Sequence, residues 1–238
     1  MTALQTTVPV PQFLSTRPRE ARGFIVPYFV TWWKDGKRAT ELTEGAAPDF
    51  RVVDTERWVN CVRFRWCWLC GKPLGRHLAF LIGPMCAVNH TTSEPPAHKV
   101  CAEYAARVCP FMVRPRMRRN ETPLPGQDSF NPDGKGYQRA GGLEILHNPE
   151  ACCIVVSRDY KVFRPHAGKA GRLINIGPFD SVDWYCEGRR ATRAEVDQAL
   201  AKGLPLLRQV AEEEGGGAVE AFGQYVAALG PWLPSEGP

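Results

Sequence analysis

The 238-residue sequence contains no run of about 18 apolar residues, so we expect no membrane-spanning helix. Its first residues, MTALQTTVPVPQFLSTRPREARG, have neither a basic start nor an apolar centre, which argues against a secretory leader. Nucleotide-binding and hydrolase patterns are also missing, because NPDGKG (131–136) and AGKAGR (167–172) lack the Walker spacing and no serine follows a nucleophile-elbow pattern. We therefore expect a cytoplasmic protein, and the sequence shows no catalytic constellation.

Cysteine, by contrast, is plentiful, with nine residues in the chain. In a reducing compartment, closely spaced cysteines more often bind metal or fill a core than form disulfides. Cys67 and Cys70 form a CxxC pair within CWLCG. Five other cysteines lie in apolar patterns without paired spacing, and we interpret them as small buried side chains: Cys61, Cys109, Cys152, Cys153 and Cys186.

The CxxC pair supplies half of a candidate metal site. A structural Zn²⁺ needs four ligands, mostly Cys and His, arranged as a tetrahedron. Cys67 and Cys70 provide two, and His98 and Cys101 are the best candidates for the others. Their spacing of three, at the start of an expected helix, places them on one helix face near an N-terminus that favours a thiolate. Cys86 lies between the two pairs and is an alternative to His98.

The pattern CxxCG…HxxC, with its second pair opening a helix, resembles a treble-clef zinc finger over roughly residues 60–110. The resemblance implies a structural Zn²⁺ held by a knuckle that donates Cys67 and Cys70, followed by a hairpin, and by a helix N-terminus that donates His98 and Cys101. Treble clefs occur in nucleic-acid binders, HNH nucleases and protein-interaction modules, so the scaffold alone does not decide the function. The stretches CAEYAARVCPF and EGRRATRAEV also resemble parts of bacterial and phage proteins without an assigned activity.

Periodicity and turn signals predict an α+β fold: a zinc-stapled, treble-clef-like domain followed by an antiparallel β-meander with C-terminal helices. The composition divides the chain into an extended N-terminal arm, a basic zinc-binding domain, a linker or long loop rich in Pro and Gly, and an α+β domain with C-terminal helices. The corresponding residues are 1–22, 23–119, 120–142 and 143–238.

Individual elements follow from the same signals. We expect a hairpin turn at Asp35-Gly36 and a helix capped by Asp54. A capping box at Thr192 begins a C-terminal helix that we expect Gly203 and Pro205 to break. The expected strands are 24–33, 75–83, 151–157, 160–164, 172–177 and 182–188; the expected helices are 55–65 and 98–108; and residues 37–50 and 84–97 are expected to be irregular.

Positive charge is concentrated around the candidate zinc site. Residues 51–120 carry twelve Lys or Arg against four acids, a net +8, although the whole chain is only +5. A polyanion is one partner for such a field. The sequence thus favours a zinc-binding accessory protein that binds nucleic acid through the following residues: Arg63, Arg65, Lys72, Arg76, Arg114, Arg116, Arg118 and Arg119.

Two other functions stay open at this stage. The long Pro-rich loops also suit a regulator or inhibitor that binds a protein partner and has no nucleic-acid role. An HNH-like nuclease is less favoured. His90 lies where such an enzyme carries its general base, but Asn89 precedes it where an acidic residue is usual, and the following helix lacks the further His or Asn.

Overall fold

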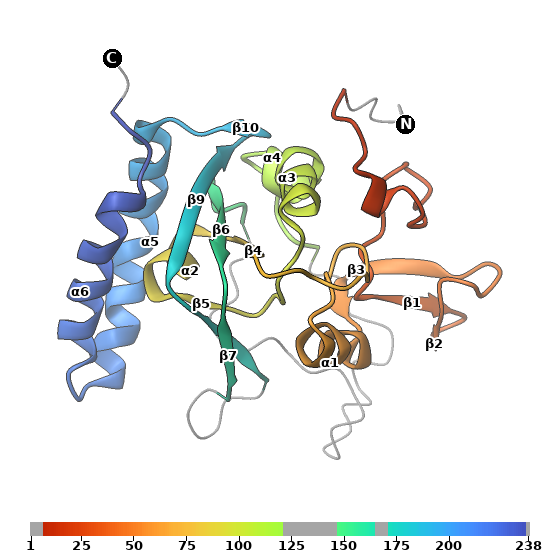
Figure 1. Ribbon diagram of the computed structural model, residues 1–238, viewed down its shortest axis with the longest axis horizontal. Coiled ribbons are helices and arrows are strands. Elements are labelled where there is room, and N and C mark those ends of the chain that lie inside the picture. Colours follow the sequence, from red (N-terminus) through yellow and green to blue (C-terminus); the bar gives the residue numbers. More distant parts are fainter. Residues whose placement is uncertain (1–6, 121–146, 165–170, 237–238) are drawn as a thin grey trace.

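The computed structural model describes residues 7–120, 147–164 and 171–236 (Figure 1). Nearly all of the expected linker, 120–142, lies outside these ranges. Within them the chain is a mixed α/β structure with three antiparallel sheets and helices at its C-terminal end. No helix in these ranges is both long and apolar enough to cross a membrane.

The central sheet has the strand order β10-β9-β6-β4. Its strands are β4 (Leu78–Ile82), β6 (Cys152–Ser157), β9 (Phe179–Cys186) and β10 (Arg189–Arg190). Every residue of β4 and β6 is buried, which is typical of strands that are covered on both faces. The apolar runs LAFLI and CCIVVS therefore reflect burial from two sides.

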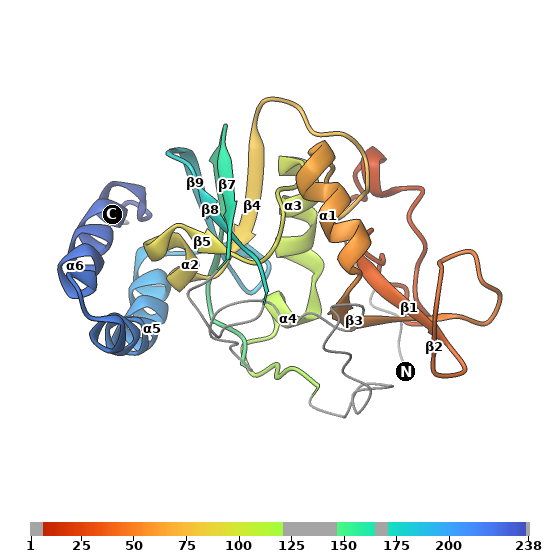
Figure 2. The same cartoon turned by 90° about the horizontal axis from the view of Figure 1, so that it is seen from below.

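Different layers cover the two faces of this sheet (Figure 2). On one face, Ala79 and Leu81 belong to the same core cluster as the buried residues of α3 (Lys99–Val108). On the other face, Leu78 and Phe80 pack with α2, α5 and α6. These helices are α2 (Pro84–Asn89), α5 (Arg193–Glu214) and α6 (Ala218–Leu229), and the short 3-10 helix η3 (Gly230–Trp232) follows them.

A smaller sheet of order β5-β8-β7 lies on the same side as α2. It contains β5 (Thr91–Thr92), β7 (Tyr160–Phe163) and β8 (Leu173–Ile176). Because β4 pairs with β6 and β5 pairs with β8, strands that precede residues 120–142 share sheets with strands that follow them. The four later strands form as predicted, but not as one meander, since β6 pairs with β9 and not with β7.

Three local predictions were wrong. The strand expected at 24–33 is confined to β1 (Val30–Lys34), and the region expected to be irregular before Asp54 contains β2 (Lys37–Ala39) and β3 (Ala47–Val53). The expected loop 84–97 contains α2 and β5. β1, β2 and β3 pair with one another, whereas α2 and β5 contact α5, α6 and β8 much later in the chain. In each case, pairing and packing outweigh weak local propensity.

Helix α5 is also longer than predicted, because it continues through Gly203 and Pro205. Gly203 packs directly against Met85 of α2, where a Cβ would come within 2.7 Å of the methionine side chain. The glycine therefore permits close helix packing instead of ending the helix. The capping box at Thr192 and Glu195 forms as predicted.

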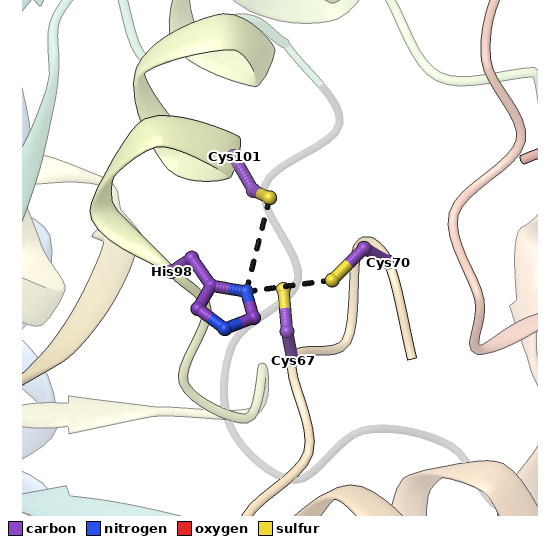
Figure 3. A group of neighbouring side chains, drawn as sticks. All are labelled: Cys67, Cys70, His98 and Cys101. Atoms are coloured by element: carbon purple, nitrogen blue, oxygen red, sulfur yellow. Dashed lines mark hydrogen bonds between the residues drawn. The ribbon is translucent and has the colours of Figure 1, made fainter. Parts of the chain in front are cut away.

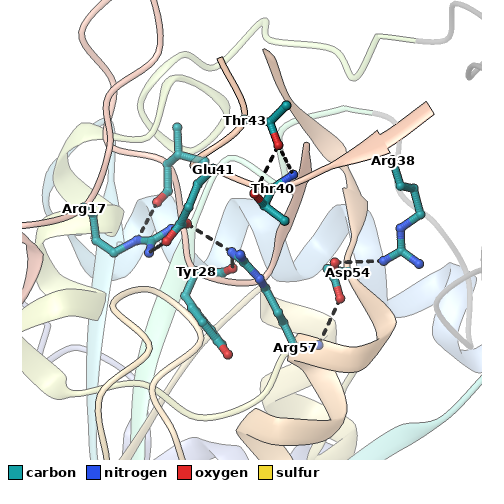
Figure 4. A network of polar contacts seen from close by, with 9 residues as sticks. Arg17, Tyr28, Arg38, Thr40, Glu41, Thr43, Asp54 and Arg57 are labelled. Atoms are coloured by element: carbon teal, nitrogen blue, oxygen red, sulfur yellow. Dashed lines mark hydrogen bonds and ion pairs between the residues drawn. The ribbon is translucent and has the colours of Figure 1, made fainter. Parts of the chain in front are cut away.

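Ion pairs and hydrogen bonds connect the N-terminal part of the chain to the rest of the protein (Figure 4). The Arg17 guanidinium donates to both carboxylate oxygens of Glu41, at 3.1 and 2.7 Å. Arg57 of α1 (Thr55–Phe64) donates to the same carboxylate at 3.1 Å and to the Tyr28 carbonyl at 2.6 Å. Asp54 caps α1 as predicted. Arg17, together with the buried Leu14, thus connects the described part of the expected N-terminal arm to the rest of the protein.

Glu41 joins two arginines, and this gives a test of the network. Burial opposes ionisation of Glu41, but hydrogen bonds from Arg17 and the charges of Arg17 and Arg57 outweigh it and lower the pKa of the carboxyl. We expect Glu41→Gln to lower the free energy of unfolding by about 1–3 kcal/mol at neutral pH. Because the folded-state pKa is depressed, this difference is lost as the pH falls through that value. Denaturant unfolding at pH 7 and pH 3 measures both effects.

Glu44→Gln is the matched control, because Glu44 is exposed in the same turn and its carboxylate makes no ion pair with the described residues. Equal effects of the two substitutions at pH 7, or a Glu41→Gln difference that does not decrease as the pH is lowered, would contradict this role.

Candidate metal centre

A short hairpin positions the first two donors. Helix α1 ends at Phe64, and Arg65 takes a left-handed conformation (φ 53°) that reverses the chain. The Leu74 N–H then donates to the Arg65 carbonyl at 2.7 Å, and the Cys67 N–H donates to the Lys72 carbonyl at 2.8 Å. We call residues 65–74 the zinc hairpin, and Cys67 and Cys70 lie at its tip.

Gly71 completes the turn at the tip, with φ 76°. A Cβ at this position would lie 2.6 Å from the ring of Tyr28, so both the backbone conformation and the available space require glycine. The hairpin is therefore held against Tyr28, the residue whose carbonyl is bound by Arg57.

Helix α3 positions the other two donors. Ala97 pairs with Ala79 of β4 through two backbone hydrogen bonds, of 3.0 and 2.7 Å. The next residue, His98, is the N-cap of α3, and Cys101 lies in the first turn. The edge of the central sheet thus fixes the point at which the donor-bearing helix begins.

The structure brings all four predicted ligands together (Figure 3). One donor atom from each of Cys67, Cys70, His98 and Cys101 lies within 4.8 Å of the others. His98 Nδ1 is 3.4 Å from Cys70 Sγ and 3.9 Å from Cys101 Sγ. All three cysteines are buried and His98 is half-buried. No second such group of His, Cys, Asp or Glu occurs among the residues that the structure describes.

Two contacts that the sequence did not indicate orient His98. Its Nε2 lies 3.0 Å from the Pro73 carbonyl, which can only accept, so Nε2 carries the proton and Nδ1 faces the sulfurs. The ring of Phe13 stacks on the imidazole, with centroids 4.3 Å apart and planes 10° apart. Phe13 belongs to the 3-10 helix η1 (Gln12–Leu14), and Leu14 is buried in the same core cluster as the three cysteines.

The protonation of the cluster reflects the closeness of its donors. Hydrogen bonds from Cys101 and Cys67 hold the pKa of the Cys70 thiol far below its usual range. Hydrogen bonds to Cys67 and Cys70 raise the pKa of His98 to about 10. Hydrogen bonds with Cys67 and Cys70 raise the pKa of the Cys101 thiol well above its usual range. Of the Cys70 and Cys101 thiols, Cys70 therefore ionises more readily, and a cation bound among the donors would displace the protons that remain on them.

The remaining cysteines are not part of this group. Cys86 lies in α2 and packs on the opposite face of the central sheet, so it does not replace His98. Burial raises the pKa of Cys61 and of Cys152 to about 12, which suits neutral core thiols. None of the nine cysteines forms a disulfide.

His90, the residue considered for a nuclease, is the left-handed C-cap of α2. Its ring stacks on Phe179, with centroids 4.1 Å apart, and lies 5.9 Å from the Tyr225 ring. Burial lowers its pKa. His90 belongs to no group of metal-ligating side chains in the described part of the chain, and its side chain is half-buried.

The predicted basic residues form two groups. Arg63, Arg65, Lys72 and Arg76 lie on or beside the zinc hairpin, whereas the group from Arg114 to Arg119 follows α4 (Pro110–Val113). Helix α3 separates the groups, because His98 is at its beginning and α4 follows its end. Its ten residues span about 15 Å.

Most of these cations are not neutralised. Within the described residues, Arg63, Arg65, Lys72, Arg76, Arg114 and Arg116 form no ion pair. In contrast, Lys99 of α3 pairs with Asp183 at 2.8 Å. The zinc hairpin therefore carries uncompensated positive charge.

Comparison of the chain with protein-family models, with curated proteins and with solved structures found no match.

The orientation of His98 leads to a specific prediction. If the site binds Zn²⁺, we expect His98 Nδ1 to be the ligand atom and Nε2 to retain its proton, because the Pro73 carbonyl accepts from Nε2. Long-range ¹H–¹⁵N correlation of the imidazole should show this tautomer. A protonated Nδ1 in the loaded protein would contradict the geometry.

Proposed function

We propose that Cys67, Cys70, His98 and Cys101 bind one structural Zn²⁺ ion. The observation that carries this proposal is the convergence of four donor atoms within 4.8 Å of one another. Three thiolates and one imidazole form a soft donor set that suits Zn²⁺ and does not suit Mg²⁺ or Ca²⁺. Since the protein would supply all four ligands of a tetrahedral ion, no position is left to activate water, and the role is structural.

The order of the parts supports a treble-clef-like arrangement. A hairpin that donates two ligands is followed by β4, whose residue Ala79 pairs back to Ala97 directly before the donor-bearing helix. Helix α2 and β5 lie between these two pairing partners. They form an insertion that connects the proposed zinc module to the core cluster of Leu78 and Phe80, on the other face of the central sheet.

The proposed function of the module is to bind nucleic acid. The zinc hairpin and its neighbours carry Arg63, Arg65, Lys72 and Arg76 without carboxylate partners in the described residues. Cations of this kind neutralise phosphates and release the counterions that surround them. The Zn²⁺ would hold the hairpin rigid and thereby fix the spacing of these charges.

The zinc proposal predicts the consequence of losing one ligand. Cys70→Ser should abolish stoichiometric zinc, because the hydroxyl of serine is a poor ligand and three donors remain. Elemental analysis of purified protein should give one zinc per chain for the wild type and much less for the variant. Cys61→Ser is the control, since Cys61 is also fully buried but is not among the four donors. Retention of one zinc in Cys70→Ser would refute the assignment.

The nucleic-acid proposal predicts a strong dependence on salt. The affinity for a 20-base-pair duplex should fall between 50 mM and 200 mM salt, because binding releases counterions. Replacing Arg63, Lys72 and Arg76 together by glutamine should weaken binding and reduce the slope of log K against log salt by about one unit per lost phosphate contact.

The matched control replaces Arg193 and Arg208 by glutamine, since these exposed α5 residues are already paired with carboxylates four positions further on. Absence of binding by the wild type at 50 mM salt would rule out a nucleic-acid role and leave protein recognition as the alternative.

A further inference from the structure

We infer that Phe64 and Trp66 form a platform on which an unpaired nucleic-acid base stacks, so that the preferred ligand is a single strand. This inference deepens the proposed nucleic-acid binding and depends on it. One of these rings is exposed, the second ring contacts it, and cations lie beside both.

Phe64 faces away from the protein core. It follows Val62 by two positions, which corresponds to about 200° around the axis of α1. Val62 packs against the core cluster that includes Phe80, whereas the Phe64 side chain is 51% exposed. The Phe64 ring contacts Trp66 and Arg63 but leaves about half of its side-chain surface open to solvent, and this open surface is available to a ligand.

The second ring fixes the orientation of the first. The centroids of Phe64 and Trp66 are 5.6 Å apart, and the planes of the rings are inclined by 37°. Trp66 is held in turn by the hairpin, where it pairs with Pro73, and by an edge contact with Tyr28 at 6.1 Å. Trp66 therefore gives Phe64 a rigid support. Because the ring is already held in place, stacking of a base on it would cost little conformational entropy of the protein.

Positive charge accompanies the rings. The Arg63 guanidinium lies over the Phe64 ring, 5.3 Å from its centroid, and has no carboxylate partner in the described part of the chain, so a base would stack on the part of the ring that Arg63 leaves open. Arg65 stands between the two aromatic residues in sequence and is likewise unpaired there. Proteins that bind single strands without sequence preference combine aromatic rings, which stack on the bases, with cations, which contact the phosphate backbone.

A single strand fits these features better than a duplex, because a base within a duplex offers no free face to a ring on the protein surface. The many unpaired cations near the platform also favour a polyanion over an apolar protein surface. DNA and RNA share the base and phosphate chemistry involved, and the test distinguishes them.

The experiment measures binding of full-length, zinc-containing protein to labelled dT20 DNA, U20 RNA and a 20-base-pair duplex by fluorescence anisotropy at 50 mM salt. Phe64→Ala removes the ring, and Phe64→Tyr restores it. Phe50→Ala is the matched control, since Phe50 is 44% exposed in β3 but makes no ring or cation contact with the described residues. Zinc content verifies that each variant is folded around the metal.

We expect Phe64→Ala to weaken binding to one or both single strands about 5- to 30-fold. Binding to the duplex should change less than twofold, and Phe64→Tyr and Phe50→Ala should bind as the wild type does. If Phe64→Ala binds single strands like the wild type while the Arg63, Lys72 and Arg76 variant is impaired, the platform is refuted and the proposed function stands. If the wild type binds no nucleic acid at all, both are refuted.

Discussion

The convergence of three sulfurs and one imidazole nitrogen is the constraint on which the rest of this structure depends. It joins a hairpin at the end of α1 to the first turn of α3. In the described part of the chain, the backbone contacts between these segments include a long hydrogen bond of 3.4 Å, from the Trp68 N–H to the Pro96 carbonyl. A bound cation would convert this proximity into a rigid connection, because metal binding and folding free energy are coupled.

The surroundings of the four donors are adapted to hold them. Pro73, from the returning arm of the hairpin, sets the tautomer of His98, and Phe13, from the N-terminal segment, covers its ring. The Arg17–Glu41–Arg57 network fastens that segment to α1, the helix that leads into the hairpin. The central sheet fixes the other side through the pairing of Ala79 with Ala97. The donor positions are therefore determined by the N-terminal segment, by the hairpin and by the pairing of Ala79 with Ala97.

This arrangement explains which features could be predicted from the sequence. The four candidate ligands were identifiable because their spacings of three are local signals of a turn and of a helix face. The Asp54 cap, the Thr192 capping box and most strands were identifiable for the same reason. The roles of Phe13 and Pro73 left no local signal, since Phe13 meets His98 only through the tertiary fold. The continuity of α5 was also hidden, because Gly203 serves packing against Met85.

The central claim is that one ion joins all four donors, and X-ray absorption spectroscopy of the zinc-loaded protein tests it most directly. The account predicts a four-coordinate zinc with three sulfur ligands at about 2.3 Å and one imidazole nitrogen at about 2.0 Å. A spectrum with four sulfurs, or with six light-atom ligands, would show that Cys67, Cys70, His98 and Cys101 do not share one ion.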